Sequence, residues 1–252
     1  MREGDIGLSQ RADEERVIRP PISRRSCEFD VCDGSGFVVD EETRTSSPCR
    51  CRPLRLARTR ARRLEGQIPK LYREISFDHS DVIDIERNCP AQVREVRSYV
   101  RGLGANIEHG RGLWLTGKYG TGKTALAMIV SKAAIDAGHT VAIYSCPRLL
   151  SVIRESIDGG GMLDFLDRLA QVDLLHIDDL GAERRTEWVL EQLYSIVNTR
   201  YEEQRATLVT SNLDVEALTA QVGERIVSRL EGMCGDPLPF YGADARRKTY
   251  SG

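Results

Sequence analysis

The sequence predicts an α/β domain with a mostly parallel sheet between helices, preceded by a small N-terminal module rich in cysteine. Three observations support this prediction. From residue 112 onward, short apolar runs alternate with stretches of helical periodicity, which is typical of strands joined by crossover helices. A glycine-rich turn separates the first apolar run from the first helix of this series. Four of the seven cysteines lie within residues 27–51.

Composition divides the chain into three parts. Residues 1–26 are polar and carry a Pro-Pro breaker, so we expect a flexible arm; residues 27–65 hold the cysteine module and a basic helix; residues 66–252 form the α/β domain, entered through a linking segment at 66–84. In this domain we expect strands at 112–116, 140–145, 172–177 and 206–210, and helices at 90–103, 123–137, 147–157, 162–170, 186–203 and 222–231.

Bulk properties describe a soluble globular protein. Hydrophobic residues make up 40% of the chain and the formal net charge is −2, so the molecule as a whole does not favour a polyanionic partner. No run approaches the length of a membrane span, and the first residues lack the apolar core of a signal peptide. We therefore expect a cytoplasmic protein without a membrane partner, whose cysteines are thiols or metal ligands.

The module's cysteines follow the pattern C-x4-C, a sixteen-residue gap and C-x-C, formed by Cys27, Cys32, Cys49 and Cys51. A tight turn and a short strand, at 33–39, lie between the two pairs. Four thiolates in two close pairs can surround Zn²⁺ tetrahedrally, and a unit this short would take its folding energy from the metal. Because C-x2-C is the usual spacing, free cysteines are the alternative.

A run of arginines follows the module. Residues 50–63 contain seven arginines and no acidic residue, and Leu54, Ala57, Ala61 and Leu64 fall on one helical stripe. An amphipathic helix with a basic face suits a nucleic acid or an acidic protein surface. A solvated helix whose arginines only maintain solubility is an equally good interpretation.

The glycine-rich turn reads G-x-x-x-x-G-K-T, the P-loop signature, between a predicted strand and a predicted helix. Its glycines let backbone N–H groups turn inward around a phosphate, at which the helix N-terminus also points its partial positive charge. Lys123 can reach the β- and γ-phosphates of ATP, and the Thr124 hydroxyl can coordinate Mg²⁺. We expect ATP to contact Gly117, Tyr119, Gly120, Thr121, Gly122, Lys123, Thr124 and Ala125.

A second acidic motif ends the strand predicted at 172–177. Asp178 is the candidate magnesium ligand and Asp179 the candidate base that positions the attacking water, with Glu183 as a nearby substitute. Alternatively, Asp179 and Glu183 only cap the following helix. His176 lies in mid-strand, and we interpret it as a core residue.

Polar residues also end the strand at 206–210. Asn212 would face the ligand crevice at the carboxyl edge of the sheet, where it could orient the water or touch the γ-phosphate. The alternative is a turn or a helix cap before Leu213. Arg225 and Arg229 share one face of the next helix without an acid three or four residues away, so they are candidates for an arginine finger that reaches a neighbouring subunit. Solvated surface arginines are the alternative.

These motifs together resemble the DnaC/DnaI-type helicase-loader branch of the AAA+ ATPases. The similarity rests on Gly117–Thr124, Ile177–Glu183, Thr210–Leu213 and Glu224–Leu230, and it covers about 66–248 well and the cysteine module loosely. By this resemblance Asn212 is the first sensor, Arg229 is preferred to Arg225 as the finger, and Arg246 is the second-sensor arginine. The family usually has an aromatic residue where this chain has Ala245.

The resemblance implies an ATPase that loads the replicative hexameric helicase onto single-stranded DNA, with ATP, Mg²⁺ and Zn²⁺ bound and with self-association into a ring or spiral. One alternative is an IstB-type transposition ATPase that acts on double-stranded DNA with a transposase; the cysteine module argues modestly against it. Another is a nucleotide-gated adaptor with little hydrolysis, because Asp179 stands where most relatives of this architecture have Glu.

Overall fold

The computed structural model describes residues 27, 29–40, 43–52 and 68–242, and the chain forms two compact units, Met1–Pro53 and Leu54–Gly252. Each unit is described by itself. Three predictions fall outside the described residues: the arm at 1–26, most of the basic helix at 50–63, and Arg246. No helix among the described residues is long and apolar enough to span a membrane.

The first unit is built on a hairpin. Strand β1 (Phe37–Asp40) pairs antiparallel with β2 (Thr45–Pro48), so that Phe37 lies opposite Pro48. The predicted turn before β1 is present: the Asp33 carboxylate accepts a hydrogen bond from the backbone N–H of Ser35 at 2.9 Å. The buried centre of the described part of this unit consists of cysteines, flanked by the half-buried Val38.

The second unit contains one five-stranded sheet in the order β4-β5-β6-β3-β7, with all neighbours parallel. Parallel strands covered on both faces are expected to be apolar runs, and most residues of these strands are buried. The strands are β3 (Leu113–Gly117), β4 (Val141–Ser145), β5 (Leu174–Asp178), β6 (Ala206–Ser211) and β7 (Leu238–Phe240).

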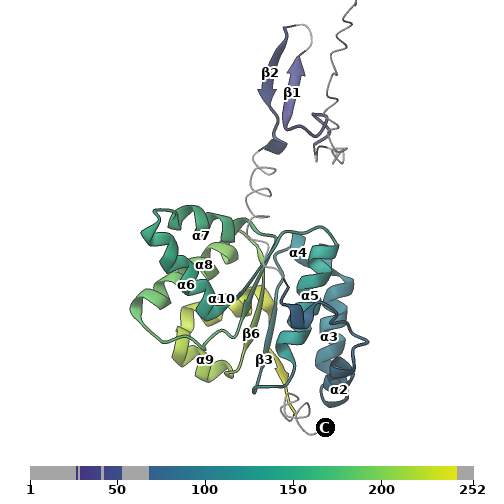
Figure 1. Ribbon diagram of the computed structural model, residues 1–252, viewed down its shortest axis with the longest axis vertical. Coiled ribbons are helices and arrows are strands. Elements are labelled where there is room, and N and C mark those ends of the chain that lie inside the picture. Colours follow the sequence, from purple (N-terminus) through teal and green to yellow (C-terminus); the bar gives the residue numbers. More distant parts are fainter. Residues whose placement is uncertain (1–26, 28, 41–42, 53–67, 243–252) are drawn as a thin grey trace, which may run out of the picture. The chain divides into compact units, whose positions relative to one another are not determined.

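Helices cover both faces of the sheet (Figure 1). One layer consists of α2 (Ser80–Asn88), α3 (Pro90–Arg101), α4 (Leu103–Glu108) and α5 (Lys123–Asp136), preceded by the 3₁₀ turn η1 (Lys70–Tyr72). The other consists of α6 (Cys146–Asp158), α7 (Met162–Gln171), α8 (Glu187–Glu202), α9 (Val215–Val222) and α10 (Glu224–Cys234).

Alternation along the strands gives each layer its own core. In β3, Trp114 packs with the layer of α6 to α10, while its neighbours Leu113 and Leu115 pack with the layer of α2 to α5. The connection after β3 runs through α5 on one face, and the connection after β6 runs through α9 and α10 on the other. The carboxyl ends of β3 and β6 therefore meet at a switch in topology, where open α/β sheets bind ligands.

The predicted α/β class is confirmed, and the predicted strands and helices lie within three residues of the observed ones. Helices α2, α4 and α9 and strand β7 were not predicted. Three of these elements have fewer than nine residues, too short for a clear periodic pattern. Helix α2 begins inside the expected linking segment, where the ring of His79 accepts a hydrogen bond from the backbone N–H of Asp81 and caps the helix.

Candidate functional site

The glycine-rich turn has a backbone that side chains would disrupt. Gly117, Gly120 and Gly122 all have positive φ angles, of 136°, 75° and 91°. A Cβ atom at Gly117 would overlap the carbonyl oxygen of Phe240, and one at Gly122 would overlap the side chain of Ile85. The turn between β3 and α5 thus needs glycine for conformation and for space, as the P-loop interpretation requires.

Lys123 begins α5 and is only 4% exposed. Its ammonium group donates hydrogen bonds to the carbonyl oxygens of Gly117 and Lys118, at 2.7 and 2.9 Å, and to Oδ1 of Asn212 at 2.8 Å. The lysine after β3 and the asparagine after β6 therefore meet across the switch point. Tyr119, at the tip of the turn, is 68% exposed.

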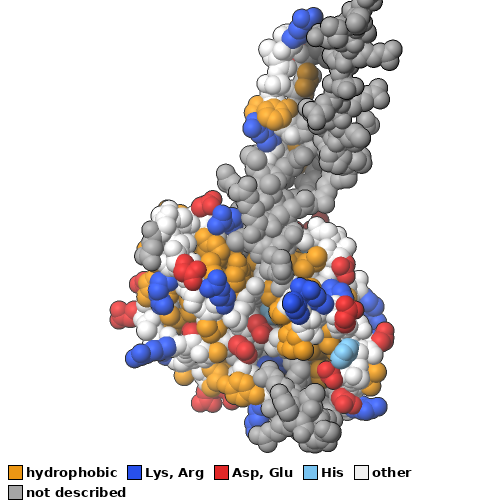
Figure 2. Space-filling model, viewed as in Figure 1, with side chains coloured by type: hydrophobic (Ala, Val, Ile, Leu, Met, Phe, Trp, Pro, Cys, Tyr) orange, Lys and Arg blue, Asp and Glu red, His pale blue; other side chains and the backbone are white. Residues whose placement is uncertain are grey.

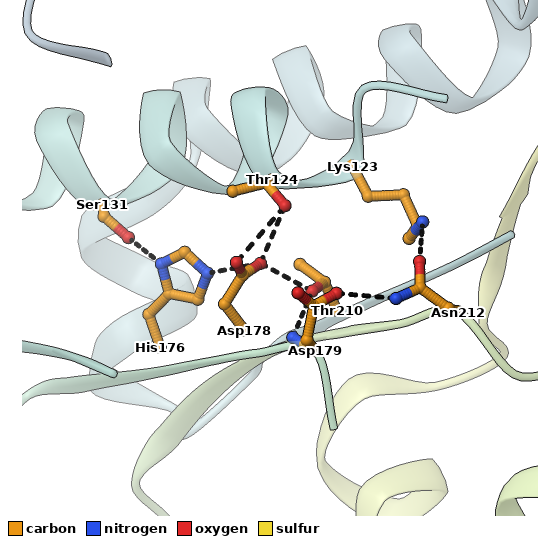
Figure 3. A network of polar contacts seen from close by, with 8 residues as sticks. All are labelled: Lys123, Thr124, Ser131, His176, Asp178, Asp179, Thr210 and Asn212. Atoms are coloured by element: carbon orange, nitrogen blue, oxygen red, sulfur yellow. Dashed lines mark hydrogen bonds and ion pairs between the residues drawn. The ribbon is translucent and has the colours of Figure 1, made fainter. Parts of the chain in front are cut away.

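A second set of contacts surrounds Asp178 at the end of β5 (Figure 3). The Thr124 hydroxyl lies 3.0 Å from Oδ1 and 3.3 Å from Oδ2 of this carboxylate, and the Thr210 hydroxyl donates to Oδ1 at 2.7 Å. Burial alone would raise the pKa of Asp178, but His176, Thr210 and Thr124 together outweigh it, so that the pKa is lowered. The carboxylate is thus held in the charged form that a magnesium ligand requires.

Asp179 occupies a strained position. Its φ of +57° lies in the left-handed region, where Asp is one of the few residues tolerated. Its backbone N–H donates to the Thr210 hydroxyl at 2.9 Å, and its Oδ1 accepts from the Asn212 amide at 2.8 Å. Asn212 therefore bridges Lys123 and Asp179, and the polar ends of β3, β5 and β6 form one connected network.

The Glu183 carboxylate forms a hydrogen bond within its own loop. Its Oε2 accepts the backbone N–H of Gly181 at 3.0 Å, and the residue is 8% exposed. Asn212 does not cap α9. Asp214 caps this helix by accepting a hydrogen bond from the backbone N–H of Ala217, while Asn212 bridges Lys123 and Asp179.

The two candidate finger arginines differ in their surroundings. Arg229 is half-buried on α10; its guanidinium donates to Asn198 Oδ1 at 2.6 Å and to the Tyr194 hydroxyl at 3.0 Å, both on α8, and it lies over the Tyr194 ring. The Arg225 side chain is exposed and has no hydrogen bond or ion pair within the described part of the chain. Sequence spacing excluded local ion pairs for Arg229 but did not reveal these partners.

The four cysteines of the first unit converge. Their sulfur atoms all lie within 4.8 Å of one another, with Cys27 and Cys49 3.7 Å apart and Cys32 and Cys51 3.5 Å apart. A tetrahedron with Zn–S bonds of about 2.3 Å has sulfurs roughly 3.8 Å apart, whereas a disulfide needs about 2.05 Å. The cluster therefore has the dimensions of a Cys₄ zinc site.

The pKa values of two thiols in the cluster are shifted in opposite directions. Backbone hydrogen bonds, led by that from Val31, lower the pKa of Cys27 to about 6, while burial raises the pKa of Cys51 to about 12. Hydrogen bonds with the three neighbouring thiols also raise the pKa of Cys51, and repulsion from the Cys27 thiolate adds to them. A bound cation would reverse this effect. Arg50 and Arg52 lie over the rings of Phe29 and Phe37.

Charges on the second unit are mixed in sign. On the face that Figure 2 shows, Lys and Arg side chains are interspersed with Asp and Glu side chains. This visible surface therefore offers no broad basic field, and the formal net charge of the whole chain is −2. Any nucleic acid bound on this face would need local contacts.

Comparison with known proteins agrees with this geometry. The family model of the IstB-like ATP binding proteins matches residues 54–229. The chain belongs to this family. The IstB-like chain is 34% identical to protein YdaV of Escherichia coli K12 over 116 residues, 46% of this chain and 47% of YdaV, so it spans about half the length of that relative.

Helicase loaders are among the relatives of this IstB-like protein. The replicative helicase loader DnaC of Escherichia coli K12 is 26% identical over 187 residues, which cover 69% of this chain and 74% of DnaC. The crystal structure of the DnaC helicase loader covers 69% of this chain and 100% of its own, with a TM-score of 0.59 and 25% identity. The resemblance to DnaC-type loaders and the AAA+ fold predicted from the sequence are thereby confirmed.

Proposed function

We propose that this IstB-like protein is an ATPase that loads the replicative DNA helicase onto single-stranded DNA in the cytoplasm. The observation that carries the ATPase part is the bridge of Asn212 between Lys123 and Asp179 at the switch point of the sheet. The similarity to DnaC supports the loading part. The arm at 1–26 and the module at 27–65 would then be attachments to an ATPase domain at 66–252.

Each residue of the network has a task in this proposal. The P-loop backbone and Lys123 hold the β- and γ-phosphates, and Thr124 and Asp178 hold magnesium, which neutralises charge on the transferred phosphate. Asp179 accepts a proton from the water that attacks the γ-phosphorus, as the bond to the leaving ADP breaks. Asn212 lies between Lys123 and Asp179 and orients that water.

We place the site at an interface between subunits. Arg229 of one subunit, with Arg225 beside it on α10, stabilises the charge on the γ-phosphate bound by the next subunit, and Arg246 completes the site as a second sensor. ATP and DNA then favour a ring or spiral of subunits, which hydrolysis releases. The Cys₄ cluster holds zinc, so that the first unit can contact the helicase or DNA.

Co-purification tests the proposed partner. The tagged full chain, passed over extract of its source cells with and without ATP, is expected to retain a hexameric replicative helicase and to retain more of it with ATP. Retention of a transposase instead, on double-stranded DNA, would favour the IstB-type alternative that the family model supports. Stable partner binding with ATP but no DNA-stimulated turnover would favour the adaptor, which Asp179 in place of Glu supports.

The arginine finger is tested by separating the contacts of Arg229 within its own subunit from its proposed contact with the γ-phosphate of the next subunit. Arg229→Ala is expected to keep ATP affinity within about twofold but to lose DNA-stimulated hydrolysis by about a hundredfold or more, because trans arginines act on the transition state. Asn198→Ala removes a partner of Arg229 within the subunit and leaves the guanidinium. We expect it, and Arg225→Ala, to have smaller effects on steady-state turnover.

An Asn198→Ala variant as inactive as Arg229→Ala would assign Arg229 to packing of α10 against α8. Full activity of Arg229→Ala combined with an inactive Arg225→Ala would transfer the finger role to the exposed arginine. Both comparisons use melting temperature to confirm that the variants are folded.

A further inference from the structure

His176 is a buried polar side chain that the proposed chemistry does not use. It is 0% exposed in the middle of β5, and Nδ1 of its ring lies 3.0 Å from the hydroxyl of Ser131, on the inner side of α5. Its other ring nitrogen, Nε2, has no hydrogen-bond partner within the described residues. An unsatisfied buried donor or acceptor destabilises the folded state, so the position calls for a reason.

The unsatisfied nitrogen faces the magnesium-holding acid of the proposed site. His176 Nε2 lies 3.8 Å from Oδ1 of Asp178. Figure 3 shows the histidine ring directed at this carboxylate. Ser131 and Thr124 are seven residues apart on α5, which places them on one face of the helix. The series Ser131, His176, Asp178 and Thr124 therefore joins α5 to β5 at two points.

The Asp178 carboxylate determines which ring nitrogen carries the proton, and the Ser131 hydroxyl, which can donate or accept, adapts to it. In a neutral ring, one nitrogen donates and the other accepts. If Nδ1 carried the proton, the lone pair of Nε2 would face the carboxylate of Asp178, which is repulsive. With Ser131 donating to Nδ1, Nε2 carries the proton and directs its N–H at Asp178.

This arrangement distinguishes the two oxygens of Asp178. Oδ1 faces three donors: Thr210 at 2.7 Å, Thr124 at 3.0 Å and the His176 nitrogen at 3.8 Å. Among the described residues, Oδ2 has only the longer contact to Thr124 at 3.3 Å. The carboxylate is thus restrained through one oxygen, which leaves the other with capacity for a cation.

We propose that His176, oriented by Ser131, is a positioning residue that holds the Asp178 carboxylate for magnesium bound with ATP. The inference rests on the proposed ATPase function and adds a residue to it. Partners that orient a metal ligand typically contribute about 10- to 100-fold to metal affinity. The effect should therefore be on magnesium and not on nucleotide binding without magnesium.

Two substitutions separate positioning from packing. In His176→Gln, the amide nitrogen can take the position of Nε2 beside Asp178. In His176→Asn, the shorter side chain places its amide nitrogen only at the position of Nδ1. His176→Asn is expected to raise the magnesium concentration at half-maximal binding of a fluorescent ATP analogue by about tenfold, and His176→Gln to stay within about twofold of the parent. Ser131→Ala, which removes the hydroxyl that holds Nδ1 of the ring, should give an intermediate shift.

The matched control is His139→Asn. His139 Nδ1 lies 3.9 Å from Asp173 Oδ2, a similar pair away from the nucleotide network, and its loss should leave the magnesium dependence unchanged. Equal shifts for His176→Asn and His176→Gln, or no shift in either, would overturn the positioning role while the parent still binds the analogue. A parent protein that binds no analogue at any magnesium concentration would instead overturn the proposed function itself.

Discussion

Replacing Lys123 with Ala is expected to weaken ATP binding severely. The Lys123 ammonium is the cation of the P-loop, and its three hydrogen bonds hold it between the turn and Asn212. Truncating one partner of a buried, charged hydrogen-bonded pair costs about 2–5 kcal/mol, so ATP affinity should fall by about 30-fold or more. Calorimetric titration with ATP and magnesium measures the loss.

A matched lysine in the same turn supplies the control. Lys118 is exposed, and it is the backbone carbonyl of Lys118 that contacts Lys123. Lys118→Ala should therefore keep ATP affinity within about threefold, since exposed charges contribute little. If Lys123→Ala bound ATP as the parent does, or if the two variants lost equal affinity, the role of Lys123 in holding phosphate would be refuted.

The site residues that could be predicted from the sequence are those that belong to motifs of neighbouring residues in the chain. Gly117–Thr124 lies between a strand and a helix, and Asp178 directly ends an apolar run, so their placement followed from neighbours in the chain. Asn212 was placed because parallel strands bring their carboxyl ends to one edge. The structure adds that Asn212 contacts both Lys123 and Asp179.

What the sequence did not predict depends on contacts between distant segments. The Thr210 hydroxyl joins Asp178 to the backbone of Asp179, a contact that its place in the Thr210–Leu213 motif did not reveal. Arg200 reads as an ordinary helix arginine, but it is fully buried and its guanidinium donates to the carbonyl oxygens of Leu169, Val172 and Ala206. Periodicity cannot reveal such partners, since the fold alone brings them together.

The order of strands explains why these distant residues lie close together. Strand β6 lies between β5 and β3, so the polar residues at its end can reach the acids on one side and the P-loop on the other. Thr210 contacts the β5 side, and Asn212 spans to Lys123 after β3. A change at β6 should therefore affect phosphate binding and the acidic motif together.

Removing zinc is expected to unfold the first unit and leave the second intact. The described core of the first unit is the cysteine cluster with Val38, and a two-stranded hairpin alone is marginally stable in water. A structural zinc site contributes about 10–16 kcal/mol in small domains, far more than this core can replace. After chelation, the amides of β1 and β2 should exchange with solvent rapidly, while ATP binding by the second unit is unchanged.

Cysteine substitutions make the same test without a chelator. Cys49→Ser should reduce zinc from about one ion per chain to a small fraction, because a Cys₄ site needs all four thiolates. Cys234→Ser is the control: its sulfur donates to the carbonyl oxygen of Thr207 in the second unit, a contact that a serine hydroxyl can keep. Full zinc content in Cys49→Ser, or a hairpin that stays protected after chelation, would refute a structural metal, and the converging cysteines would then be free thiols.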